Sequence, residues 1–367
     1  MKQIFSLILV LSLLLCGCAS RTVETTPPTT QTPAAPPTES AAPTTEAPTT
    51  PPAGTAATVP EEPAALYNPL SGEALTSPLT GRNFAVVINN VPAAMPMHGV
   101  SRAELFFELF VNDYTTRCMA LFSDITQAEA VGSVRSLRYN FTDLCQVYDA
   151  VVIHASGSAQ VLSDLTRSGV PNLSAGESGY AYRDQDRINA GTAWEHCLFI
   201  KGQAARDYAE SKGIRVTRQE NADYGLHFTQ DGTPAGGETA GTVTINLIHD
   251  GVKKQNVMEY DPQTGAYRFH QFGQLMYDGA TEEPIRFQNV IVMLCRVENQ
   301  SVYHVADLLG SGEGYFACGG KLIPIKWFHE NMEDPITFTL TDGTPLQLGV
   351  GSSYIAIAPL SSTVEFE

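Results

Sequence analysis

Short apolar or alternating runs recur through the first half of the chain and are separated by amphipathic stretches. The predicted strands cover residues 84–89, 119–123 and 150–154. The predicted helices cover residues 158–167 and 202–212, and Gly169 and Gly213 stand where a left-handed residue commonly ends a helix. This alternation predicts a sheet covered by helices in residues 65–220.

The pattern changes after about residue 225, where alternating runs follow one another with short turns between them. The predicted strands there are 242–247, 257–260, 266–270, 285–297 and 353–358. Residues 261–265, Gly319-Gly320 and Asp342-Gly343 suit tight hairpin turns, and a helical period is expected only at 302–309. Residues 221–367 are therefore predicted to be mostly antiparallel β, as a small sandwich or partly open barrel. The fold class of the whole is α+β.

The amino terminus has the pattern of a bacterial lipoprotein signal. Lys2 precedes an apolar run over 4–15, and small residues then lead to Cys18. This predicts a signal peptide over 1–17, lipidation of Cys18 and anchoring on the outer face of the cytoplasmic membrane. A plain signal peptide or a short uncleaved anchor is the alternative, although about a dozen apolar residues are too few to span a bilayer.

Residues 18–64 are predicted to be the lipidated cysteine followed by a disordered linker. The segment consists almost entirely of Thr, Pro, Ala and Glu, and Val23 and Val59 are its large aliphatic residues. Such a composition buries too little apolar area to offset the entropy of ordering. Its reach lies between about 35 Å as a coil and about 130 Å when extended.

Charge and cysteine usage exclude several classes of function. A net charge of −17 makes nucleic acid a poor partner. The cysteines after Cys18 are odd in number and widely spaced, so at least one is unpaired within the chain; their disulfide state is otherwise open. They are Cys118, Cys145, Cys197, Cys295 and Cys318. Without a CxxC or HExxH motif, we expect no metal site and no cofactor.

Basic residues are scarce, and five arginines cluster in the first predicted domain. They are Arg117, Arg135, Arg138, Arg183 and Arg187. A segment from His154 through Ser156 to Ser158 joins a strand end to a helix start, where backbone N–H groups favour an anion. The arginines therefore predict a site for an anionic ligand, together with His154, Ser156, Asp184 and His196. The alternative is that acidic neighbours hold the arginines in structural ion pairs.

A complete catalytic set cannot be assembled from these residues. His154 and His196 have the chemistry of general bases, and Ser156 or Ser158 that of nucleophiles. The sequence around Ser156 nevertheless lacks the glycine of a hydrolase elbow, and both serines suit helix capping. We therefore name no catalytic residue.

Several motifs together resemble the YerB-like lipoproteins of Gram-positive bacteria. In the first half these are Asn68 to Glu73, Val87 to Asn90, Thr116-Arg117, Val134 to Ser136 with Arg138, His154 with Gly157-Ser158, and Arg183-Asp184 with Arg187. In the second half they are Glu259 to Asp261, Asn289 to Val292, Gly312 to Tyr315 and Lys326-Trp327. The resemblance covers nearly all of residues 66–360 and implies a two-part architecture of unknown activity.

The chain departs from that family's pattern at three places. Met95-Pro96 replaces an Arg-Pro, Gly132-Ser133 replaces a Gly-Pro, and Glu195-His196-Cys197 replaces a Pro-His-Asn. If these positions line one pocket, this member binds a different ligand or binds more weakly.

Two functions remain in competition. The favoured hypothesis is a non-catalytic binding or accessory lipoprotein of the cell envelope, whose partners are the membrane and either an anionic envelope component or an envelope protein. The alternative is an envelope enzyme acting on a diphosphate-linked wall precursor. That alternative rests on a loose similarity to the LytR-CpsA-Psr phosphotransferases, which is an analogy of fold alone.

Overall fold

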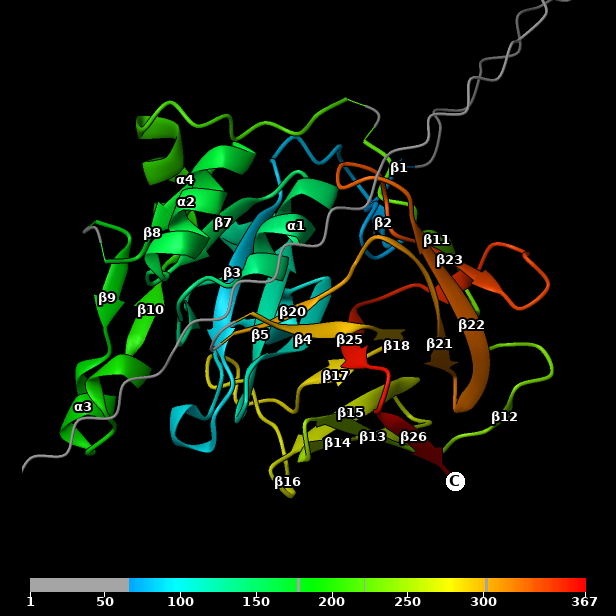
Figure 1. Ribbon diagram of the computed structural model, residues 1–367. Helices are drawn as coiled ribbons and strands as arrows, with labels where there is room; N and C mark the ends of the chain where they lie inside the picture. The colour runs from blue at the N-terminus through cyan, green and yellow to red at the C-terminus, as the bar shows by residue number, and fades with distance from the viewer. Residues whose placement is uncertain (1–65, 177–178, 221, 301–302) are drawn as a thin grey trace, which may run out of the picture. The chain divides into compact units, whose positions relative to one another are not determined.

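A sheet of eleven strands runs through both predicted halves of the chain in the computed structural model (Figure 1). The structure describes residues 66–176, 179–220, 222–300 and 303–367. The predicted signal peptide, Cys18 and nearly all of the linker lie outside the described residues.

The large sheet joins strands that are far apart in the sequence. In spatial order, its main path consists of β12 (Glu238–Thr239), β22 (Lys321–His329), β21 (Gly310–Cys318), β18 (Asn289–Cys295), β25 (Ser353–Pro359), β4 (Leu105–Asn112), β5 (Thr115–Phe122), β3 (Phe84–Asn89), β7 (Val151–His154) and β8 (Asn172–Ser174), with β23 (Thr337–Leu340) beside β22. The central strands are buried on both faces, as their continuous apolar runs require.

Helices and small strands cover the first half of this sheet. The α-helices are α1 (Tyr139–Val147), α2 (Ala159–Ser168), α3 (Gln185–Asn189) and α4 (Gly202–Ser211). A three-stranded sheet consists of β6 (Val131–Gly132), β10 (Leu198–Ile200) and β9 (Ala181–Arg183). Helices α1 and α2 pack on one face, and α4 with β10 packs on the other. Among the described residues, no helix is long and apolar enough to cross a membrane.

A second sheet belongs to the carboxyl-terminal half. Its strands are β16 (Gln274–Leu275), β15 (Ala266–Gln271), β14 (Val252–Asp261), β13 (Thr242–His249) and β26 (Thr363–Phe366), with β17 (Arg286–Phe287) beside β15. Phe269 and Met258 of this sheet share a buried cluster with Phe106 and Tyr354 of the large sheet. The two sheets therefore pack face to face.

Short strand pairs complete the fold. They are β1 (Leu66–Tyr67) with β2 (Ala74–Leu75), β11 (His227–Thr229) with β24 (Gln347–Gly349), and β19 (Val297–Gln300) with β20 (Tyr303–Ala306).

Strand β25 connects the two halves of the sequence. It lies between β18 and β4 and is parallel to both, with Ile355 opposite Ile291 on one side and Phe107 on the other. The large sheet therefore continues across the predicted boundary at residue 220, and that boundary stays a prediction. The α+β fold class is confirmed.

Local predictions succeeded where a turn or cap fixes the element. The Ser158 hydroxyl caps α2 by accepting from the Val161 N–H at 3.3 Å, and Gly169 ends this helix with φ of 73°. Gly319 and Gly320 connect β21 and β22 with positive φ at both positions. The helical prediction at 302–309 was wrong because Tyr303–Ala306 is a strand whose burial alternates.

Candidate functional site

Four strands of the large sheet place residues at one edge. The parallel strands β3, β7 and β8 end there at Asn89, His154 and Ser174, and the antiparallel strand β5 begins there at Thr115. The carboxyl edge of parallel strands is the usual position of ligand sites in open sheets. Arg117 lies on β5 two residues after Thr115, so the fold places an arginine close to this edge.

Arg117 is a buried cation without a described counter-charge. It lies directly opposite Asn89 in the register of β3 and β5, and 8% of its surface is exposed. One guanidinium nitrogen donates to the Ser136 carbonyl at 2.7 Å, while Nε has no partner among the described residues. Burial lowers the pKa of Arg117 to about 9, and the positive charges of Arg138 and Arg135 act in the same direction.

Arg135 and Arg138 lie near Arg117 without an ion pair of their own among the described residues, although the exposed carboxylate of Glu195 acts on Arg135 from a longer distance. Arg135 donates to the Glu195 carbonyl at 3.4 Å, and Arg138 donates to the Leu137 carbonyl at 2.7 Å. The Arg138 guanidinium also lies 4.7 Å from the centre of the Tyr303 ring. Burial lowers the pKa of both arginines. We call Arg117, Arg135 and Arg138 the arginine cluster.

Arg183 and Arg187 lie at the periphery of this cluster. Arg183 donates to the Trp194 carbonyl at 2.6 Å and stacks on the Trp194 ring at 4.6 Å. Arg187 donates to the carbonyls of residues 94–96 and lies 5.3 Å from the Phe199 ring. Burial lowers the pKa of Arg183; the charge of Arg135 acts in the same direction, and that of Glu195 opposes it. The donors of Arg187 are engaged by backbone carbonyls. None of the five arginines forms an ion pair with a carboxylate of the described residues.

His196 joins the arginine cluster through Asn89. The Asn89 side-chain amide donates to Nδ1 of His196 at 2.8 Å, which requires that nitrogen to be unprotonated. Burial lowers the pKa of His196, and the nearby charge of Arg135 lowers it further. The predicted site residue His196 is therefore held neutral beside the arginines.

The remaining predicted site residues have structural contacts. The His154 Nδ1 donates to the Ser156 carbonyl at 3.1 Å, and the Ser156 hydroxyl lies 3.1 Å from that of Ser136. The Asp184 carboxylate caps α3 by accepting from the N–H groups of Asp186 and Arg187, each at 3.0 Å. Ser158, and not Ser156, is the helix cap. Asp184 points its negative charge into its own helix terminus.

Sequence reasoning missed the neighbours that hold the arginines. Ser136 and Glu195 supply backbone carbonyls, which leave no signal in residue type. Tyr303 is distant in sequence from Arg138. Trp194, on which Arg183 stacks, is 60% exposed and lies at the rim of the site.

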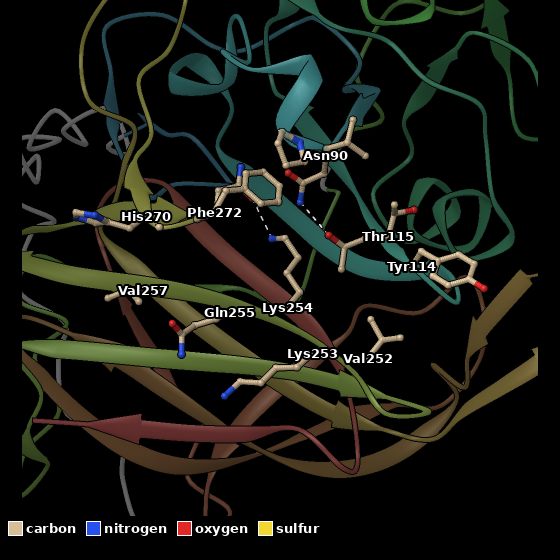
Figure 2. A pocket seen from close by; sticks show the side chains of 15 residues that line it. Asn90, Tyr114, Thr115, Val252, Lys253, Lys254, Gln255, Val257, His270 and Phe272 are labelled. Carbon is tan, nitrogen blue, oxygen red and sulfur yellow. Dashed lines mark hydrogen bonds between the residues drawn. The ribbon is translucent and has the colours of Figure 1, made fainter.

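A cleft on the other face of the same edge was also missed. Its volume is about 460 Å³, and it is lined from both halves of the sequence (Figure 2). The lining residues are Asn90 to Pro92, Tyr114 to Thr116, Val252 to Gln255, Val257 and His270 to Gly273. We call it the lysine cleft.

The base of the lysine cleft is a buried ion pair. The Lys254 ammonium donates to Glu108 Oε1 at 2.5 Å, to Asn256 at 2.7 Å and to Gln271 at 2.9 Å. Glu108 is fully buried and also accepts from Thr116 and Tyr354. Every donor of Lys254 is engaged, so its charge is neutralised inside the protein.

The described cysteines are not part of either region's chemistry. Cys118, Cys145, Cys197, Cys295 and Cys318 are all buried and free. Burial raises the pKa of each thiol, which keeps the reactive thiolate rare. No group of His, Cys, Asp and Glu side chains among the described residues has the arrangement of a metal site.

The fold and these two regions define an α+β protein with an unpaired arginine cluster at the carboxyl edge of its sheet. A model for the N-terminal domain of a protein family of unknown function, DUF3048, matches residues 70–215, and the model for that family's C-terminal domain matches residues 245–355. The chain belongs to this two-part, YerB-like family, as its motifs predicted.

Comparison with characterised sequences and structures agrees with this assignment. The chain is 26% identical to "Putative lipoprotein YerB" of Bacillus subtilis (strain 168) over 311 residues, which are 79% of this chain and 88% of that protein. It superimposes on the crystal structure of the YerB protein from Bacillus subtilis with a TM-score of 0.71 at 24% identity, covering 82% of this chain and 99% of that one. The structural likeness shows the fold.

Proposed function

We propose that this protein is a membrane-anchored, extracytoplasmic binding lipoprotein whose arginine cluster binds an anionic component of the cell envelope. The lipoprotein signal at Cys18 and the name of the Bacillus subtilis relative support the anchoring. The acidic surface argues against nucleic acid and anionic lipid as ligands, because both would be repelled except at a local cationic site.

The observation that carries the proposal is the missing counter-charge at Arg117. Removing a guanidinium from water is costly, and proteins ordinarily repay the cost with a carboxylate. The two charges that act most strongly on Arg117 are those of further arginines, although the chain has 39 acidic residues. A bound anion would supply the negative charge that Arg117 lacks. Arginine's planar fork suits the oxygens of phosphate and carboxylate groups.

The start of α2 adds to the same anion field. Its N-cap is Ser158, four residues after the end of β7 at His154. The unpaired N–H groups of the first turn carry partial positive charge. A phosphate-sized ligand is therefore favoured at this edge over a neutral one.

A thermal-shift titration of the purified full chain in detergent tests the proposal. Inorganic pyrophosphate and a glycerol-phosphate oligomer are the probes. We expect both to raise the unfolding temperature of the wild type and to have no effect on Arg135→Ala. Arg167→Ala is the matched control, because Arg167 is exposed on α2 and its one ion pair among the described residues is with Asp164. Absence of a shift in the wild type, or an equal shift in Arg135→Ala, would contradict the proposal.

The competing enzyme hypothesis predicts turnover as well as binding. Incubation with a lipid-linked diphosphate and Mg²⁺ separates the two. A binding protein leaves the diphosphate intact, whereas product formation that disappears in Arg135→Ala would establish an envelope phosphotransferase or hydrolase instead.

A further inference from the structure

The lysine cleft has the lining of a site for an uncharged ligand. The ion pair between Lys254 and Glu108 cancels the charge at its base. Val91, Pro92 and Val252 contribute apolar surface, and amide side chains contribute polar surface. Its volume of about 460 Å³ lies within the usual range of ligand sites, about 300–1,000 Å³.

Asn90 provides a buried acceptor that nothing described satisfies. Asn90 is 2% exposed, and its side-chain amide nitrogen donates to Glu108 at 3.0 Å and to Thr116 at 2.9 Å. Its Oδ1 has no partner among the described residues. A buried carbonyl oxygen left without a hydrogen bond is costly, so the position calls for a ligand that donates N–H or O–H groups.

Phe272 is held in a conformation that its residue type disfavours. Phe272 and Gly273 connect β15 and β16 as a two-residue turn, and both have positive φ, at 54° and 76°. Asn, Asp or Gly normally occupies the first position of such a turn, and a bulky residue there is strained. The strain keeps an aromatic ring at the cleft, 5.2 Å above the Lys254 ammonium (Figure 2).

We propose that the lysine cleft binds the sugar rings of a short, uncharged saccharide. Sugar hydroxyl groups supply the donors that Asn90 lacks, and the apolar face of a sugar ring packs on Phe272 and on Tyr114, which is 81% exposed at the tip between β4 and β5. A peptide is less suited, because β14 is already paired on both sides with β13 and β15 and offers no free edge for strand addition.

Phe272→Asn is the sharpest variant, because asparagine suits the turn while the ring is lost. Protein-observed NMR on the full chain in detergent would follow titration with tri-N-acetylchitotriose, cellotriose and maltotriose. We expect at least one trisaccharide to shift resonances of the cleft, and Phe272→Asn to weaken that binding at least tenfold without lowering the unfolding temperature. If Phe272 were merely structural, removing it would lower that temperature and leave affinity unchanged.

Further variants separate this site from the arginine cluster. Tyr114→Ala is expected to weaken binding at least threefold, while the exposed control Tyr67→Ala has no effect. Lys253→Ala and Arg135→Ala should each change saccharide affinity less than twofold.

Four results would overturn the inference. The first is that none of the three trisaccharides binds, and the second is that Phe272→Asn binds them as tightly as the wild type. The third is that the peptide N-acetyl-trialanine amide binds in the cleft and the trisaccharides do not. The fourth is that Lys253→Ala abolishes saccharide binding.

Discussion

The arginine cluster and the lysine cleft lie at the same edge of one sheet, but they differ in whether their cations are paired with a carboxylate. Asn89 and Asn90 are adjacent, and because side chains alternate along a strand, Asn89 contacts His196 beside the arginines while Asn90 contacts Glu108 in the cleft. On the first side no described carboxylate forms an ion pair with the cations, although the exposed Glu195 acts on Arg135 from a longer distance, and on the second side the cation is paired inside the protein. The placement of counter-charge therefore distinguishes a surface suited to anions from one suited to neutral ligands.

The buried ion pair of the cleft gives the largest expected effect. Glu108→Gln leaves the Lys254 ammonium buried without its counter-charge and should lower the free energy of unfolding by about 3–5 kcal/mol. Urea denaturation followed by circular dichroism measures this change. Glu129→Gln, at an exposed position outside the described ion pairs, should change stability by less than about 0.5 kcal/mol. Equal stability of the two variants would show that the cleft does not depend on the pair.

Ionic strength should separate ligand binding in the two regions. Raising NaCl from about 0.05 M to about 0.5 M should weaken pyrophosphate binding at least tenfold, since salt screens the attraction between the anion and the partly exposed Arg135 and Arg138. Saccharide binding in the lysine cleft should change less than twofold. Isothermal titration calorimetry at the two salt concentrations measures both. Parallel loss of both affinities would remove the electrostatic distinction between the sites.

The smallest expected effect concerns pH and His196. Burial and Arg135 lower its pKa in the folded protein, so the folded state binds fewer protons than the unfolded state as pH falls through about 6.5, and stability decreases there. A bound anion favours the charged imidazole. Sulfate, which does not titrate in this range, should therefore bind about threefold more tightly at pH 5.5 than at pH 7.5.

His196→Asn is the variant that isolates this pH effect. Its side-chain oxygen keeps an acceptor for the Asn89 amide, so the local hydrogen bond is retained. We expect sulfate affinity in this variant to be independent of pH. An unchanged pH dependence would assign the effect to another group.

Sequence patterns revealed the elements whose causes are local. Strand β3 and the capped helix α2 were predictable because burial and a serine cap act within a few residues. The insertion of β25 between β18 and β4 was not predictable, because parallel pairing joins segments about 250 residues apart and leaves no local signal. Helix α1 was not predicted for a related reason. Its buried face includes the polar residue Asn140, whose side chain forms hydrogen bonds with the backbone of Ala306, far away in the sequence.

The candidate site was predictable only in part. The scarcity of arginine in an acidic chain singled out Arg117, Arg135 and Arg138, which the fold brings together. It could not show that Asp184 caps its own helix or that Arg187 is occupied by carbonyls. The lysine cleft could not be found, because Glu108 and Lys254 meet across 146 residues of sequence.

Titration of inorganic pyrophosphate into Arg117→Met tests the central claim most directly. Methionine fills the buried space without charge, so the free energy of unfolding should stay within about 1 kcal/mol of the wild type. The account predicts that pyrophosphate affinity falls at least tenfold in this stable variant. If Arg117→Met binds pyrophosphate with wild-type affinity, Arg117 does not contribute to anion binding and the account is contradicted.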